Sequence, residues 1–241
     1  MPIQSVDRPT LWNSNAIRKI RDIRFQISTF KFQLMIILTA GHTGPHTGAQ
    51  SITTQFDEGS ETIWLRNRVA EILTNKYGLV VLMDNDTASL KLLLSELNQT
   101  GRQEDTKNHV LMSSCRNQTS KASSTVDNIL IDIHFNAHSN PQARGTETII
   151  SDHATTLELR FASHLAHTTA HALGIPLRGI KSESQTPHHR LAILHITPQS
   201  IILEVCFCTS PEDVEAYRNN REKLAADLAW AIAELILDRM T

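Results

Sequence analysis

Aromatic residues, cysteines and long apolar runs are all scarce in this chain of 241 residues, of which only 5% are aromatic. The three cysteines are Cys115, Cys206 and Cys208. An odd number, with two of them one residue apart, excludes a disulfide framework as the basis of the fold. Cys206 and Cys208 would face the same side of a strand, and free buried thiols are a better interpretation than a pair of ligands. No apolar run approaches the roughly 18 residues of a transmembrane helix, so we expect no membrane span.

An excess of charge of either sign is also missing. The formal net charge is -2, from 23 lysines and arginines against 25 acidic residues. Nucleic-acid-binding domains usually carry a basic face, so we expect no nucleic-acid partner. A hydrophobic fraction of 40% and a length of 241 residues fit one globular domain with one sizeable core. The sequence gives no indication of the oligomeric state.

Histidine, in contrast, is abundant, with 12 residues. This number favours a metal site, although most histidines must be ordinary surface or core residues. His164, His167 and His171 share one stripe of a predicted helix over 155–173. We interpret that stripe as a polar helix face rather than as a metal site.

Apolar runs alternate with helical patterns along the chain, which is typical of a mostly parallel sheet. We predict an α/β fold: a single domain with a mostly parallel twisted sheet of about six strands flanked by helices, similar to phosphorylases and hydrolases. The predicted strands cover 34–38, 79–83, 129–135, 145–150, 191–196 and 201–207. Four helices are predicted. Two of them end at Gly78 and Gly174, one covers 90–97, and one runs from Ser210 towards the C-terminus.

Two segments lie outside this pattern. Residues 1–33 form a basic N-terminal arm of unknown role, in which we recognise no signal peptide. Residues 99–127 are rich in Ser, Thr, Asn, Lys and Gln, and we interpret them as an insertion near the functional site. The remaining domain covers 34–241. After the helix that ends at Gly174, residues 178–189 are expected to form a polar loop.

Chemically capable side chains stand at three strand ends. His42 follows the first strand, His134 ends the strand over 129–135, and Glu204 lies inside the last strand. The carboxyl ends of strands in an open α/β sheet are where ligands bind. Catalytic zinc sites use three protein ligands, often two histidines and a carboxylate, and keep a fourth position open. We therefore hypothesise one zinc site, with Glu58 or Glu61 at the start of the first helix as the carboxylate.

Three segments, in order, resemble the motifs of one enzyme family. Residues 41–49 (Gly-His-Thr-Gly-Pro-His-Thr-Gly-Ala) are similar to a Gly-His-Gly-Gly…Gly-Ala opening, and residues 131–137 are similar to Ser-Ile-His-x-Asn-Ala. Residues 203–207 and 210–213 resemble Val-Glu-x-Gly-Phe followed by Asn-Pro-Glu. These are motifs of the zinc-dependent N-acetylmuramoyl-L-alanine amidases. Members of that family are cell-wall hydrolases that cut between the lactyl group of muramic acid and the first alanine of the stem peptide.

The resemblance implies a role for each matching residue. His42 and His134 would be zinc ligands, and Glu204 would be the catalytic glutamate. Alignment of the apolar positions of the first helix selects Glu58 as the third ligand, while Glu61, nearly one turn further on, remains its competitor. One Zn²⁺ per chain and peptidoglycan as the partner are implied in the same way.

The sequence also departs from the family pattern. Thr43 stands at the second glycine of the opening motif, and Cys206 stands where a small residue is frequent. Neither position is a proposed ligand, but both affect the expected shape of the substrate groove. His46, Asn136 and His138 border the site and are candidates for substrate binding.

Two other functions stay open from the sequence. One is a zinc amidohydrolase or peptidase acting on another amide, because a fold alone does not fix the substrate. The other is a non-catalytic module that binds the cell wall, which would not need both histidines and Glu204. For the amidase we expect action on the wall, in the periplasm or outside the cell. Without a recognised signal peptide, either the natural chain starts at a different residue, or the route would be dedicated export or lysis, as for phage endolysins.

Overall fold

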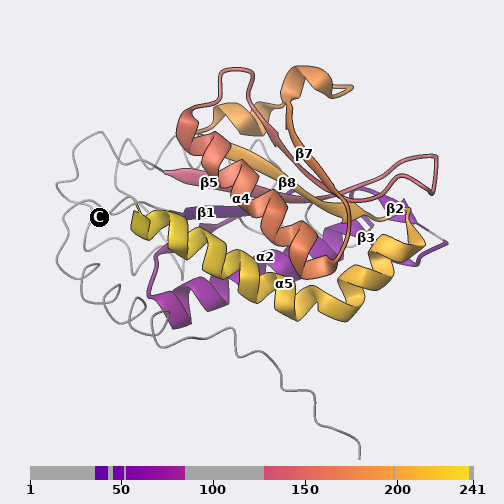
Figure 1. Ribbon diagram of the computed structural model, residues 1–241, viewed down its shortest axis with the longest axis horizontal. Helices are drawn as coiled ribbons and strands as arrows, with labels where there is room; N and C mark the ends of the chain where they lie inside the picture. Colours follow the sequence, from indigo (N-terminus) through magenta and orange to yellow (C-terminus); the bar gives the residue numbers. More distant parts are fainter. Residues whose placement is uncertain (1–35, 43–45, 52, 85–127, 198, 239–241) are drawn as a thin grey trace, which may run out of the picture. The chain divides into compact units, whose positions relative to one another are not determined.

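A computed structural model describes residues 36–42, 46–51, 53–84, 128–197 and 199–238 (Figure 1). The predicted arm over 1–33, the predicted helix over 90–97 and the predicted insertion over 99–127 lie outside these residues. None of the described helices is long and apolar enough to cross a membrane.

The centre of the fold is a six-stranded sheet in the order β4-β1-β5-β8-β6-β7. Its strands are β1 (Ile36–Ala40), β4 (Val81–Met83), β5 (Ile129–Asn136), β6 (Thr146–Ile150), β7 (Leu177–Ser182) and β8 (Gln199–Phe207). Strands β4, β1, β5 and β8 are mutually parallel, whereas β6 runs antiparallel to β8 and parallel to β7. The predicted α/β fold with a mostly parallel sheet is therefore confirmed. Because β6 is reversed, its N-terminal end lies at the edge where β1, β5 and β8 end.

Three long helices of the described chain cover one face of this sheet: α2 (Glu58–Tyr77), α4 (Thr156–Leu173) and α5 (Pro211–Asp238). Helix α5 packs against both α2 and α4 (Figure 1). Phe135 of β5 joins this layer through Tyr217 of α5 and Phe56, with ring centroids 4.9 and 4.8 Å away. Gly78 and Gly174 end α2 and α4 in the left-handed conformation, as predicted from the sequence.

The opposite face of the sheet carries its own apolar cluster, with members Ile37, Leu130, Ile149, Ile193, Leu194 and Ile202. Two of them come from the 3₁₀ helix η3 (Ala192–His195), so the predicted strand over 191–196 is wrong. A short apolar run has the same appearance in a buried helical turn as in a strand. The sixth strand is instead β7, in a segment predicted as a loop. It is an edge strand and only partly buried, so its sequence lacks the apolar signal of its neighbours.

A small hairpin connects the first strand to α2. It consists of β2 (Gln50–Ser51) and β3 (Phe56–Asp57), paired antiparallel. Another short 3₁₀ helix, η2 (Glu183–Gln185), follows β7. The hairpin matters for function because α2 begins directly after it, at Glu58.

Candidate metal centre

His42 is fixed at the end of β1 by backbone contacts on both sides. The N–H of Gly41 donates to the carbonyl of Ile133 on β5 at 2.8 Å. The carbonyl of His42 accepts from the hydroxyl of Thr62 on α2 at 3.0 Å. The imidazole is half-exposed, so it stands at the surface of the sheet edge with a rigid backbone beneath it.

Glu58 is the first residue of α2, and its side chain is only 2% exposed. Oε1 accepts the N–H of Phe135 at 2.9 Å, and Oε2 accepts the N–H of Ala49 at 2.6 Å. Burial raises the pKa of Glu58, but the His134 ring and these N–H groups outweigh it and hold the pKa below the ordinary value. The carboxylate is therefore an oriented anion.

His134 lies between two carboxylates. Its Nδ1 is 3.1 Å from Oε1 of Glu58, and its Nε2 is 3.0 Å from Oδ2 of Asp132. Burial lowers the pKa of His134, but the two carboxylates outweigh it and raise that pKa well above the usual value. The ring meets the His42 ring edge to face, with centroids 5.2 Å apart.

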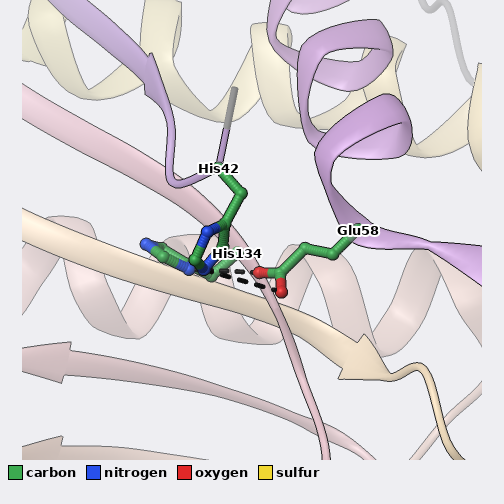
Figure 2. A group of neighbouring side chains, drawn as sticks. All are labelled: His42, Glu58 and His134. Atoms are coloured by element: carbon green, nitrogen blue, oxygen red, sulfur yellow. Dashed lines mark hydrogen bonds and ion pairs between the residues drawn. The ribbon is translucent and has the colours of Figure 1, made fainter. Parts of the chain in front are cut away.

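These side chains form one group in which a ligand atom from each of His42, Glu58 and His134 lies within 4.8 Å of the others. Figure 2 shows the Glu58 carboxylate directed at the two imidazoles. Among the described residues this is the only such group of histidine, cysteine and acidic side chains. Two imidazoles and one carboxylate are a donor set that suits zinc.

Gly48 makes this arrangement possible. Its φ is 73°, and a Cβ there would lie 2.5 Å from both the Glu58 carboxylate and the His42 ring. Only glycine fits beside two candidate ligands in this left-handed backbone conformation. On the other side, a Cβ at Gly41 would overlap the His134 ring.

Glu61, the competing carboxylate, has other partners. It accepts a hydrogen bond from the hydroxyl of Tyr217 at 3.0 Å and pairs with Arg221 at 3.1 Å. The histidine stripe of α4 is likewise engaged elsewhere, since His164 lies 3.3 Å from Glu234 on α5 and His167 bonds its own helix backbone.

Glu204 faces the group from the neighbouring strand. It stands opposite His134 in the register of β5 and β8. Within the described part of the chain, its buried Oε2 has no hydrogen-bond partner. Burial raises the pKa of Glu204 to about 7; His134 opposes this rise, and Glu58 and Glu147 add to it. A buried carboxylate oxygen without a partner is costly in an ordinary core and is typical of a functional position.

One further acidic residue borders Glu204 and was not identified from the sequence. Glu147 of β6 is the register partner of Glu204 on the other side. It is buried and accepts from Arg178 Nε at 2.6 Å, Lys181 Nζ at 2.9 Å and Asn136 Nδ2 at 2.9 Å. The predicted strand over 145–150 gave the only signal, because a strand places Glu147 on one face with Ile149.

The other residues expected to border the site differ in position. Asn136 lies at the end of β5 and is occupied by Glu147. His46 is largely exposed, and its backbone N–H is bound to Asp57 at 2.9 Å. His138 is exposed and accepts the N–H of Asn140 at 2.9 Å. Their roles in substrate binding stay predictions.

Cys206 and Cys208 are free and buried, as predicted. Burial raises the pKa of the Cys206 thiol well above its usual value and that of Cys208 to about 11. Neither belongs to the group around His134. Thr43 lies outside the described residues.

Comparison with known proteins agrees with this geometry. A family model described as N-acetylmuramoyl-L-alanine amidase matches residues 36–238. The fold is similar to the N-acetylmuramoyl-L-alanine amidase from Clostridium difficile 630, with 22% identity, coverage of 86% of this chain and 96% of that one, and a TM-score of 0.61. No curated protein matches.

Two other solved structures share the fold. One is the catalytic domain of CwlV, an amidase of the same description from Bacillus (Paenibacillus) polymyxa, with 22% identity and a TM-score of 0.56. The other is the catalytic domain of an endolysin targeting Clostridia difficile, with 22% identity and a TM-score of 0.57. Each match covers 86% of this chain and 98% of the other.

Proposed function

The chain belongs to the N-acetylmuramoyl-L-alanine amidase family, and from this premise we propose that His42, Glu58 and His134 hold a zinc ion while Glu204 transfers the protons of the reaction. The activity of the family is hydrolysis of the amide bond between N-acetylmuramic acid and L-alanine in peptidoglycan. The catalytic domain in this proposal runs from residue 34 to 241, with 1–33 as a separate arm.

The donor set fits the ion. Two imidazoles and the carboxylate of Glu58 lie within 4.8 Å of one another, and Gly48 leaves the space between them clear. Bound zinc would polarise the scissile carbonyl and lower the pKa of a water molecule. The protein orients its donors in advance, because the backbone N–H groups of Phe135 and Ala49 hold both oxygens of Glu58.

The position of Glu204 is the main support for the proposal. Its carboxylate lies on the strand beside His134, and its Oε2 has no partner among the described residues. In the proposed reaction Glu204 takes a proton from the attacking water, whose oxygen bonds to the lactyl carbonyl carbon. It then passes that proton to the alanine nitrogen as the C–N bond breaks. The products are a lactyl carboxylate and a stem peptide with a free amino end.

The substrate is peptidoglycan, so the protein acts on the cell wall. We place that action in the periplasm or outside the cell. Arg178 and Lys181, which pair with the buried Glu147 and are about one third exposed, are candidates to contact acidic groups of the stem peptide.

The test is digestion of purified peptidoglycan with and without a chelator, followed by mass analysis of the products. We expect stem peptides with a new alanine amino end, lost on chelation and restored by zinc. Release of other fragments would contradict the assigned bond. If the protein binds zinc but releases no fragment, the assignment of peptidoglycan as the substrate is wrong.

Three variants test the residue roles. Glu204→Gln should keep one zinc per chain and lower kcat by a factor on the order of 10² to 10⁴. Glu58→Gln should lose zinc, whereas Glu61→Gln, the matched control nearly one turn along the helix, should retain it. Near-normal activity in Glu204→Gln, or zinc loss in Glu61→Gln alone, would contradict these assignments.

A further inference from the structure

We propose that Asp132 is a positioning residue of the metal centre, whose carboxylate holds the imidazole of His134 with Nδ1 directed at Glu58. This inference rests on the proposed function, because it concerns one of the proposed zinc ligands. Neither the motif resemblance nor the family match assigns a role to Asp132.

The geometry places Asp132 directly behind His134. The two residues are two apart on β5, so their side chains leave the same face of the strand. Oδ2 of Asp132 is 3.0 Å from Nε2, the nitrogen on the far side of the ring from Glu58. With the Nε2–H donating to Asp132, Nδ1 is the nitrogen that faces Glu58, 3.1 Å away, and it would bind the metal once its own hydrogen is lost.

The carboxylate is itself held in place. Its other oxygen, Oδ1, accepts the hydroxyl of Thr39 at 2.6 Å, and Thr39 is the register partner of Asp132 across β1 and β5. Thr39 is also buried, so the hydroxyl has little freedom to turn away. The chain Thr39–Asp132–His134 thus fixes the ring from the rigid centre of the sheet.

His134 is the only described cation within ion-pair distance of Asp132. Asp132 itself is only 5% exposed. Burial of a carboxylate costs several kcal/mol unless it is paired, so this side chain is unfavourable here without its bond to His134.

Such a carboxylate has a known physical effect on a metal site. A ligating histidine that donates its second N–H to a carboxylate is fixed in tautomer and orientation, and its ligating nitrogen becomes more basic. The family segment that this stretch resembles has serine at the position of Asp132.

The experiment measures zinc affinity by competition with a chromophoric chelator for the wild type, Asp132→Ala, Asp132→Asn and Thr39→Val. We expect Asp132→Ala to weaken zinc binding by about 10- to 100-fold. Asp132→Asn keeps an acceptor oxygen and similar volume but no charge, so its loss should be smaller. Thr39→Val should have the smallest effect. Asp152→Ala, the same change at an exposed turn, should leave the affinity unchanged.

A second measurement separates positioning from a structural tie between β1 and β5. Long-range ¹H–¹⁵N spectra of the metal-free proteins report whether Nε2 of His134 carries a hydrogen held by Asp132. Loss of the Nε2–H signature in Asp132→Ala, together with weaker zinc binding, supports the proposal. Unchanged affinity and an unchanged ring signal, with only a lower unfolding midpoint, would overturn it. A wild type that binds no zinc overturns the proposed function instead, and an altered His134 signal in the variants would still support the positioning contact.

Discussion

Replacement of Gly48 by alanine is expected to damage the metal centre by steric contact alone. The added methyl carbon would lie 2.5 Å from the Glu58 carboxylate and from the His42 ring, whereas ordinary contact begins at 3.4 Å. The atoms must therefore separate by about 0.9 Å, beyond the roughly 0.5 Å that a functional site tolerates. Glu58 cannot move freely, because two backbone N–H groups hold its oxygens.

Gly78→Ala is the matched control for this variant. Gly78 has a φ of 70°, close to the 73° of Gly48, but a Cβ added at Gly78 would meet no heavy atom within 4 Å. Both substitutions therefore carry a similar backbone cost, on the order of 1 kcal/mol. The difference between them isolates the contact with the two ligands.

We expect Gly48→Ala to raise the zinc Kd at least tenfold relative to Gly78→Ala, which corresponds to about 1.4 kcal/mol. Competition with a chelator measures the affinity, and urea unfolding in EDTA measures the shared backbone cost. Displacement by about 1 Å should also lower kcat/KM by about 100-fold. Equal zinc affinity in the two variants would refute the reasoning that Gly48 keeps the ligand space clear.

Three other predictions concern the rest of the described chain. Arg66→Met should lower the free energy of unfolding by about 3–5 kcal/mol, since it leaves the buried carboxylate of Asp84 unpaired. Urea denaturation measures the free energy of unfolding, and removal of the Asp84 carboxylate as well should restore part of the loss. Thr155→Ala should cost about 1 kcal/mol through loss of the α4 cap, with unchanged amidase activity. Cys206 and Cys208 should resist iodoacetamide at pH 8. At a pKa of about 11, roughly one Cys208 thiol in a thousand is ionised at that pH. Labelling of these thiols, measured by mass spectrometry, should rise with pH. Rapid labelling of Cys206 or Cys208 in the folded protein at pH 8 would contradict the burial of these thiols.

The positions of the candidate ligands could be predicted because they depend on strand ends. A strand rich in isoleucine and leucine stops where its apolar run stops, and His42 and His134 follow from that boundary. The roles of Glu58 and Glu61 could not be separated by periodicity alone. They are three residues apart on α2, and only the tertiary structure directs Glu58 towards the histidines and Glu61 towards Arg221.

Both errors in the fold arise where the burial of a segment does not follow its pairing in the sheet. Strand β7 is an edge strand with half-exposed side chains, so local sequence does not distinguish it from a loop. Residues 191–196 have the opposite property, because Ile193 and Leu194 are buried by packing on the sheet without pairing to it. Asp132 was overlooked for a different reason. The pattern Ile-Asp-Ile-His does place it on the His134 face, but the strand assignment used only the apolar positions.

The reversed direction of β6 determines where the chain can accept inserted residues. The connection from β5 to β6 stays at one edge of the sheet and needs no crossover helix, unlike the connection between two parallel strands. Its far end is fixed where Asp213 accepts the N–H of Gly145 and pairs with Arg144. Residues 138–142 are exposed in between. New segments can therefore be inserted there, at the sheet edge that carries the candidate metal centre, which makes this turn a suitable place to graft recognition loops.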